Sequence, residues 1–304
     1  MKSLIVFLLF IAPLCTAAES RSIELADGSR LEGTLLLPEA PRAMIVLVSG
    51  SGPTDRDGNQ APMMVNNSLK MLAEALHEAG LASYRYDKRG VGQSSPGVEE
   101  SDLRVQTYAD DLVTVIEQVR SWADDTPLLL LGHSEGAMMA LLAAQQTGVD
   151  GVISLAGPGR PADEILREQL AGRLPGALAD EFEASLSSLR RGELVEQVSA
   201  PLASLFRPSV QPYMISWIAV DPAALAGTLG DKLTVIQGSS DLQVGAEDAD
   251  RLADAAGIEP VIIDGMNHVL KAVTGSLEEQ MPSYLDPELA LHPDLLPAIL
   301  QALE

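Results

Sequence analysis

The feature that most constrains the fold is a regular alternation of short apolar runs and longer segments with helical periodicity. Most of the runs lack the two-residue alternation of apolar and polar side chains, which is typical of strands buried on both faces of a parallel sheet. They occupy Ala43–Ser49, Leu81–Asp87, Leu128–Gly132, Gly151–Ala156, Leu233–Gln237 and Pro260–Ile263. The repeated strand–helix–strand order predicts an α/β fold with a mostly parallel, doubly wound sheet.

The remaining elements are expected around and between these runs. Two further strands, Ser22–Leu25 and Arg30–Leu37, flank an Asp27-Gly28 turn, a strong hairpin signal. Helices are expected at Val65–Ala79, Val105–Trp122, Ser134–Gln146 and Glu247–Ala255, with a closing helix at Pro287–Leu303.

One long interval, from Gly157 to Lys232, contains no buried-strand run. It is rich in Ala, Leu, Glu and Arg and is punctuated by prolines, which favours several short helices. Because the interval lies between two core strands, it should emerge at the carboxyl edge of the sheet, where open α/β sheets bind ligands. We expect residues 158–231 to form a helical cap on a core of residues 19–157 and 232–304; a purely structural insertion is the alternative.

The first 18 residues are typical of a secretory signal peptide. Lys2 precedes the apolar run Leu4–Leu14, which at eleven residues is shorter than the roughly twenty that span a bilayer. Small residues allow cleavage after Ala17 or Ala18. We therefore expect a secreted or periplasmic protein without stable membrane association after cleavage; an uncleaved anchor is the alternative. Lipidation of Cys15 is disfavoured by the bulk of Leu14.

Composition narrows the classes of function. Cys15 is the only cysteine, so a cleaved chain would have no thiol for catalysis, disulfides or metal binding. The sequence has 43 Asp and Glu against 20 Lys and Arg, a formal charge of −23. This charge disfavours nucleic acids and anionic membranes as partners. No cofactor or metal is indicated, and the oligomeric state is not predicted.

The most informative motif is Gly132-x-Ser134-x-Gly136, which lies between an apolar strand and a run of small and apolar residues. A strand that turns sharply into a helix strains the residue at the bend, and glycines two positions away let the backbones pass. The serine hydroxyl is then exposed at a helix amino terminus, where N–H groups stabilise developing negative charge. Ser134 is the predicted nucleophile.

A serine nucleophile requires a base and an acid that orients the base. Among the four histidines, His268 lies in a loop just after a predicted strand and is the expected base. His77 and His292 fall in predicted helices, and the side chain of His133 is expected to point away from the serine. Asp241, shortly after the run Leu233–Gln237, is the expected acid. The weaker alternatives are Asp264, Asp248 and Asp250.

Acyl transfer also requires an oxyanion hole. The N–H of Glu135, which follows the nucleophile, is the first expected donor. The second should come from the Gly-rich loop of residues 49–58, with Ser51 as the candidate and Gly52 as the alternative. The loop is not a phosphate loop, because no Gly-Lys-Ser/Thr follows.

Charged residues near these motifs favour a structural role. Tyr86-Asp87 and Arg89-Gly90 predict a hydrogen-bonded corner beside the site, and Asp55, Arg56 and Asp57 predict ion pairs that hold the Gly-rich loop.

The chain resembles the α/β-hydrolase superfamily over nearly its whole length after residue 18. Four stretches look like a bacterial branch of secreted serine esterases related to the serine aminopeptidase-like hydrolases. They are residues 50–58, Tyr86-Asp-Lys-Arg-Gly-Val-Gly-Gln-Ser94, Gly-His-Ser-Glu-Gly and Arg207-Pro-x-x-Gln-Pro212. The resemblance implies Ser134 as nucleophile, Asp241 as acid and His268 as base. Ala137 departs from a second glycine that many relatives carry.

We therefore predict a serine carboxylic ester hydrolase that acts on small to medium acyl esters through an acyl-enzyme. An aminopeptidase or amidase with the same triad is the alternative, and a non-catalytic binding protein is a less favoured one. Gly52, Met214 and Trp217 are the predicted substrate contacts. Six apolar residues either pack the cap or line an acyl pocket: Leu205, Phe206, Tyr213, Met214, Ile215 and Trp217.

Overall fold

The computed structural model describes residues 18–123 and 125–303. The predicted signal peptide therefore lies almost wholly outside the described residues. Within them, every helix is too short or too polar to cross a bilayer.

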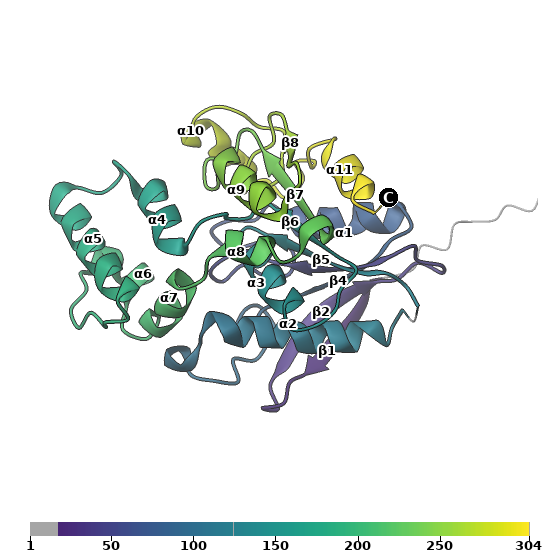
Figure 1. The fold of residues 1–304 in the computed structure, drawn as a ribbon, viewed down its shortest axis with the longest axis horizontal. Coiled ribbons are helices and arrows are strands. Elements are labelled where there is room, and N and C mark those ends of the chain that lie inside the picture. The colour runs from purple at the N-terminus through teal and green to yellow at the C-terminus, as the bar shows by residue number, and fades with distance from the viewer. Residues whose placement is uncertain (1–17, 124, 304) are drawn as a thin grey trace, which may run out of the picture.

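A single sheet of eight strands organises the molecule (Figure 1). The strands are β1 (Glu19–Glu24), β2 (Arg30–Leu36), β3 (Met44–Val48), β4 (Ala82–Tyr86), β5 (Leu128–His133), β6 (Gly151–Leu155), β7 (Leu233–Gly238) and β8 (Val261–Ile263). Their spatial order is β1-β2-β4-β3-β5-β6-β7-β8. The hairpin strands β1 and β2 are antiparallel to their neighbours, and the six others run parallel. The predicted mostly parallel sheet and its hairpin are confirmed.

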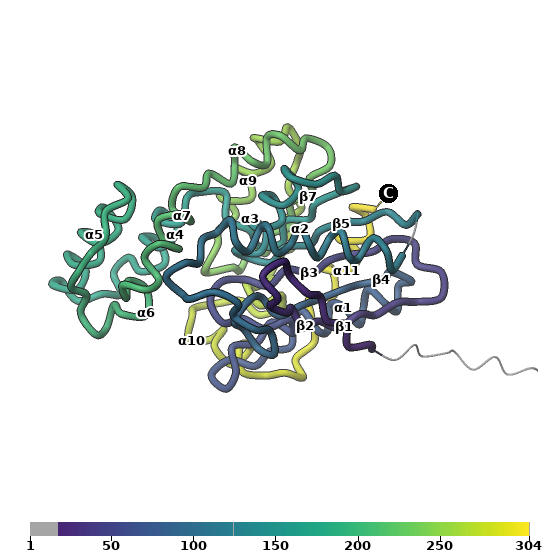
Figure 2. The backbone as a smooth tube through the Cα atoms, turned by 90° about the horizontal axis from the view of Figure 1, so that it is seen from below, coloured from purple at the N-terminus to yellow at the C-terminus, as the bar shows by residue number. Residues whose placement is uncertain are grey.

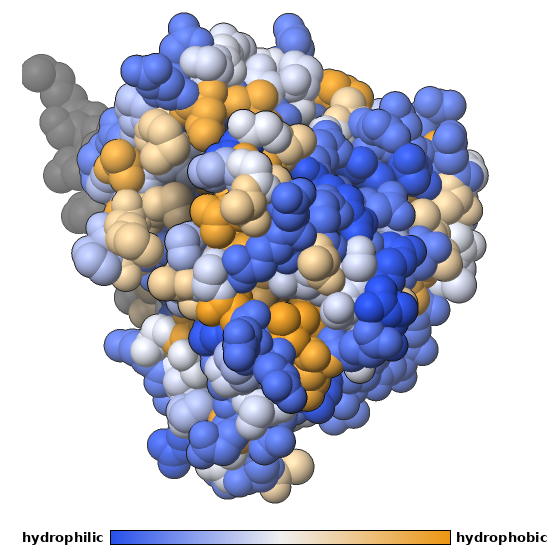
Figure 3. All heavy atoms as spheres, turned by 90° about the vertical axis from the view of Figure 1, so that its left-hand side faces the viewer, coloured by the Kyte–Doolittle hydropathy of each residue, from blue (hydrophilic) through white to orange (hydrophobic). Residues whose placement is uncertain are grey.

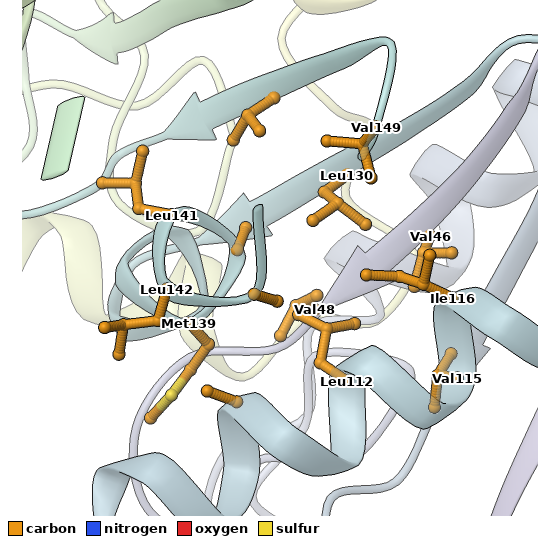
Figure 4. Close-up of a cluster of buried hydrophobic side chains, with 14 of the residues drawn as sticks. Val46, Val48, Leu112, Val115, Ile116, Leu130, Met139, Leu141, Leu142 and Val149 are labelled. Atoms are coloured by element: carbon orange, nitrogen blue, oxygen red, sulfur yellow. The ribbon is translucent and has the colours of Figure 1, made fainter. Parts of the chain in front are cut away.

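Each face of the sheet is covered by helices, because alternate strand residues point to opposite sides. Val46 and Leu130 belong to one apolar cluster with α2 (Val105–Arg120), α3 (Glu135–Ala144) and α9 (Ala246–Ala256). Figure 4 shows side chains of β3, β5, α2 and α3 meeting in this cluster. Ile45 and Leu131 belong to a second cluster with α1 (Ser68–Glu78) and α11 (Leu295–Gln301). The inner strands β3, β4, β5 and β6 are therefore buried on both faces, as the apolar runs predict.

The predicted closing helix over Pro287–Leu303 is wrong in its first half, because α11 begins only at Leu295. Upstream of it, Leu291 forms a β-bridge with Lys271, and the N–H of His292 donates to the carbonyl of Leu270. These backbone hydrogen bonds with the loop after His268 hold the segment out of a helix.

Residues 157–232 contain five α-helices: α4 (Ala162–Leu170), α5 (Gly176–Arg190), α6 (Ala203–Phe206), α7 (Gln211–Ile218) and α8 (Pro222–Ala226). Helices α4 to α7 lie together beyond one end of the sheet (Figures 1 and 2) and enclose an apolar cluster of their own, with Phe182, Leu186 and Phe206 at its centre. The outer face on this side of the molecule is largely polar, with smaller apolar patches (Figure 3). Helix α8 returns to the sheet and packs on α3 and α9.

Short helices complete the chain. They are α10 (Leu277–Gln280) and four 3-10 helices: η1 (Glu100–Asp102), η2 (Ala200–Leu202), η3 (Gly230–Lys232) and η4 (Met281–Tyr284).

Candidate active site

Ser134 lies between the last residue of β5 and the first residue of α3. Its φ of 55° and ψ of −128° are strained for a residue with a side chain. Close packing around the bend explains the neighbouring glycines. A Cβ on Gly132 would lie 2.2 Å from the carbonyl oxygen of Gly136, and one on Gly136 would lie 2.3 Å from that of Val48. The sequence thus forms the expected sharp turn with the serine at its apex.

Asp241 and His268 come from the loops after β7 and β8, and both are buried. Nδ1 of His268 lies 2.7 Å from Oδ2 of Asp241. The other carboxylate oxygen accepts hydrogen bonds from the N–H groups of Gln243 (2.8 Å) and Val244 (3.0 Å). Because the carboxylate accepts the Nδ1 proton, Nε2 of His268 is left free to accept one.

The carboxylate of Asp241 is stabilised against its burial. Burial raises its pKa, but the charge and hydrogen bond of His268 and the N–H groups of Val244 and Gln243 together hold the pKa below its usual value. The alternative acid, Asp264, accepts from the hydroxyl of Ser239 at 2.9 Å instead. The geometry therefore pairs Asp241, and not Asp264, with His268.

A small cavity of about 90 Å³ joins these elements. Ser134, His268 and Ser51 line it together with Gly50, Gln243 and Tyr284. A Cβ on Gly50 would lie 3.1 Å from Cβ of Ser134 and 3.6 Å from its Oγ, so the Gly-rich loop passes directly against the serine. The structure thus places Ser134, His268 and Ser51 around one space.

The side chain of His133 is directed to the loop of His268. His133 lines the same small cavity, and its Nε2 lies 2.8 Å from the carbonyl oxygen of His268. Burial, followed by the charge of His268, lowers the pKa of His133 to about 4. A neutral ring with its proton on Nε2 donates to that carbonyl and supports the loop that carries His268. Sequence reasoning missed this contact because it joins the end of β5 to a loop 135 residues further along the chain.

The Gly-rich loop is held by polar contacts on several sides. The hydroxyl of Ser49 donates to the carbonyl of Thr54 (3.0 Å), and that of Thr54 donates to the carbonyl of Ser51 (2.7 Å). The ammonium group of Lys88 donates to the carbonyl of Gly50.

The neighbouring corner contains the predicted ion pairs of Arg56 and Asp57, whereas the Asp55 carboxylate accepts from the backbone N–H groups of Asp57 and Asn59. Arg56 pairs with Asp87, and Arg85 pairs with Asp57, each over 2.7 Å. The Arg89 guanidinium contacts both Asp111 and Asp27.

A second, larger cavity of about 390 Å³ also borders the Gly-rich loop. Gly52 and Pro53 line it together with Lys88, Glu135, Met139, Arg207, Val210 and Tyr213. Glu135 is buried, and its Oε1 accepts a hydrogen bond of 2.5 Å from the hydroxyl of Tyr213 on α7. Burial raises the pKa of Glu135, while the charge of Lys88 and the Tyr213 hydroxyl oppose that rise.

The predicted substrate contacts fall in different places. Gly52 lines the larger cavity. Met214 is buried in the cluster of α4 to α7, and Trp217 packs against both this cluster and the one shared by the sheet, α2 and α3. Substrate contact by Met214 or Trp217 stays a prediction. On α7 it is Val210, at the N-cap, and Tyr213 that line the larger cavity.

The described residues contain no cluster of three or more His, Cys, Asp or Glu side chains that could hold a metal ion. The chemistry proposed below uses the side chains and backbone N–H groups alone.

Known proteins are similar to this chain in sequence or in fold. Esterase EstD of Thermotoga maritima is 28% identical over 247 residues, which are 79% of this chain and 58% of EstD. The chain thus spans less than two thirds of the length of EstD. Among solved structures, the α/β-hydrolase GrgF from Penicillium sp. sh18 is similar with a TM-score of 0.60 at 18% identity, covering 94% of this chain and 98% of GrgF. Est1E from Butyrivibrio proteoclasticus is similar with a TM-score of 0.54 at 17% identity, covering 82% of this chain and 90% of Est1E.

The likeness to the solved structures shows the α/β-hydrolase fold. The sequence profile of the Hydrolase_4 family, described as serine aminopeptidase, S33, matches residues 65–271, about two thirds of the chain. This chain therefore belongs to the Hydrolase_4 family of α/β-hydrolases.

Proposed function

We propose that the protein is a serine carboxylic ester hydrolase with Ser134 as nucleophile, His268 as base and Asp241 as orienting acid. The observation that carries the proposal is the buried His268–Asp241 pair, which opens onto the cavity lined by the strained Ser134. A serine at such a bend beside a histidine oriented by a carboxylate is the arrangement that acyl transfer requires. The name of EstD supports an esterase over other acyl transferases.

The mechanism follows from the positions of these groups. Oγ of Ser134 attacks the acyl carbon and gives its proton to Nε2 of His268, while Asp241 stabilises the imidazolium. The N–H groups of Glu135 and Ser51 bind the oxyanion of the tetrahedral intermediate. Collapse of the intermediate breaks the ester C–O bond, and His268 returns the proton to the leaving alcohol. Water then attacks the acyl-enzyme by the same steps and releases the acid.

Residues 158–231 act in this proposal as a cap that selects substrate size. The larger cavity is lined by Val210 and Tyr213, at the start of α7, and by Gly52 and Glu135, which neighbour the predicted oxyanion hole. Its volume suits a small to medium acyl group, and Val98, Met139 and Val210 give it an apolar wall.

The amidase alternative would use carboxylates to hold a substrate amine. The two glutamates that line the larger cavity already have partners: Glu135 accepts from Tyr213, and Glu100 pairs with Arg207 and Ser209. Each carboxylate keeps lone pairs that could accept from an amine, so the choice of esters rests on the similarity to EstD and not on this cavity.

The test is a panel of p-nitrophenyl acyl esters beside aminoacyl p-nitroanilides. Wild type should hydrolyse the esters, and Ser134→Ala, His268→Ala and Asp241→Asn should each lose most of that activity while staying folded. Triad removal costs on the order of 10³–10⁶ in turnover. Asp264→Asn is the matched control and should be mild. More than a few per cent of activity in Ser134→Ala would exclude the serine mechanism, and faster hydrolysis of anilides would favour the amidase.

Export is a separate proposal, supported by the sequence of residues 1–18. Protein purified from a host's periplasm or medium should begin at Ala18 or Glu19. An intact N-terminus on that protein would refute cleavage.

A further inference from the structure

Lys88 is a lysine in a place where a cation is costly. It follows β4, its side chain is only 5% exposed, and its ammonium donates to the carbonyl of Gly50 in the Gly-rich loop. Burying an ammonium carries a large desolvation cost, whereas an apolar side chain of similar length, such as Met, would carry none. The scaffold role of the corner does not require it, because the neighbouring Asp87 and Arg89 make their own ion pairs.

The hydrogen bond from Lys88 determines where the next N–H points. In a trans peptide the C=O and the following N–H point in opposite directions. With the Gly50 carbonyl fixed on Lys88, the Ser51 N–H is directed away from Lys88. Ser51 lines the small cavity with Ser134 and His268, and in the described residues its N–H has no acceptor.

The next peptide is fixed from the other side. The hydroxyl of Thr54 donates to the carbonyl of Ser51 at 2.7 Å, and the side-chain amide of Gln60 lies 3.4 Å from the same oxygen. The peptide groups before and after Ser51 are therefore both held by side chains. The Gly50–Ser51 peptide, which carries the Ser51 N–H, is held by the charged side chain of Lys88, and the Ser51–Gly52 peptide is held by neutral ones.

A counter-charge for Lys88 lies on the other half of the predicted oxyanion hole. Glu135 lines the larger cavity with Lys88, and its own N–H is the first donor. Burial lowers the pKa of Lys88, and the charge of Glu135 opposes that fall. The Tyr213 hydroxyl fixes the Glu135 carboxylate from α7. Lys88 and Glu135 therefore line one cavity, and the charge of each opposes the effect of burial on the pKa of the other.

We propose that Lys88 is a positioning residue that orients and polarises the Gly50–Ser51 peptide, so that the Ser51 N–H completes the oxyanion hole. This inference rests on the proposed function. A polarised N–H stabilises the oxyanion more than the neutral ester carbonyl, so Lys88 should act on the chemical step and not on substrate binding.

The test compares Lys88→Met with wild type on one p-nitrophenyl ester. Removing one oxyanion-hole donor costs about 10²–10³ in kcat in acyl-transfer enzymes. We expect Lys88→Met to lose a comparable factor in kcat with KM changed less than about threefold. The Ki of a trifluoromethyl ketone, which forms a tetrahedral adduct with the serine, should rise by the same factor as kcat/KM falls.

Lys232→Met is the matched control. Its ammonium also donates to a backbone carbonyl, that of Val149 at 3.3 Å, but at the amino end of β7. This variant should leave kcat, KM and Ki unchanged. A folded Lys88→Met variant with kcat within about threefold of wild type, or with raised KM alone, overturns the inference.

A second measurement needs no variant. In wild type, the amide proton of Ser51 should move downfield when the trifluoromethyl ketone binds, because it then donates to an oxyanion. An unmoved Ser51 resonance overturns the inference even if Lys88→Met fails to fold. The Ser134→Ala variant separates the two levels: if it stays active, the proposed function fails; if it is inactive while Lys88→Met is active, only the role of Lys88 fails.

Discussion

The carboxyl edge of the sheet and the helices α4 to α7 meet around the larger cavity, but they are held in place by different means. Ser134 follows β5 directly, and Asp241 and His268 follow β7 and β8 within a few residues, so the strand ladder fixes their spacing. Helices α4 to α7 pack around their own apolar cluster. Their polar contacts with the rest of the chain include Tyr213 with Glu135 and Arg207 with Glu100.

The two regions should therefore tolerate mutations differently. A change in the sheet shifts Ser134, Asp241 and His268, the proposed catalytic groups. A change within α4 to α7 can be absorbed by a cluster that contributes no proposed catalytic group. The chemistry should therefore be sensitive to the sheet, and substrate size should be sensitive to the helices.

The largest expected effect tests whether the two regions unfold separately. Phe206 is fully buried in the cluster of α4 to α7, and Phe→Ala in a core costs about 3–5 kcal/mol. We expect Phe206→Ala to reduce hydrogen-exchange protection of amides in α5 and α7 while β3 and β5 keep theirs. Leu130→Ala, in the cluster beneath the sheet, should reduce protection in both regions. Equal loss in β5 with Phe206→Ala would contradict separate units.

The next effect concerns the sheet side and its pH dependence. Because the pKa of His133 is lowered from its usual 6.5 to about 4, the unfolded chain binds more protons than the folded one between these values. The free energy of unfolding should therefore fall as the pH drops from about 6.5 to about 4, by about 3 kcal/mol from this group. The His133→Asn variant should be less stable at neutral pH, and its free energy of unfolding should lose this part of its dependence on pH. Urea titrations at several pH values measure it, and an unchanged slope would contradict the assignment.

A smaller effect should distinguish residues that line the larger cavity from residues that pack behind it. Val210→Trp places bulk in the cavity and should reduce kcat/KM on longer acyl esters by roughly 10–200-fold, since a methylene more or less in a pocket has that effect. The acetyl ester should change far less. Met214→Leu, inside the neighbouring cluster, is the control and should leave the chain-length profile alone. If the control shifts the profile and Val210→Trp does not, Met214 is the substrate contact.

The smallest effect concerns the contact between Glu100 and Arg207. Both side chains are about two-fifths exposed (41% and 42%), and exposed ion pairs contribute about 0–1 kcal/mol. Glu100→Gln should therefore lower the melting temperature by no more than about 4 °C for a chain of this size. A larger loss would show that this contact, and not the apolar cluster, holds the helices in place.

Much of the fold follows from short-range patterns in the sequence. The apolar runs became buried strands, and the Gly132-x-Ser134-x-Gly136 turn formed because its packing tolerates no larger residue at either glycine. The pairing of Asp241 with His268 could be predicted because parallel strands end at one edge of a sheet.

What could not be predicted depends on contacts between distant segments. The ring of His133 touches the His268 loop, and Lys88 touches the carbonyl of Gly50, 38 residues earlier. Helix α11 starts late because the residues before it pair with the segment after His268. Nothing in the local sequence of α7 distinguishes Tyr213, which lines the larger cavity, from Met214, which packs in the cluster.

The two outer strands of the sheet have a consequence for crowded solutions. An unpaired strand edge can recruit the same edge of another copy and begin aggregation. Here β1 is exposed along most of its length and carries Glu19, Arg21 and Glu24, while β8 at the opposite edge is only three residues long. Charge at one edge and brevity at the other leave little backbone on which a second copy could extend the sheet, so the chain should resist edge-to-edge aggregation as its concentration rises.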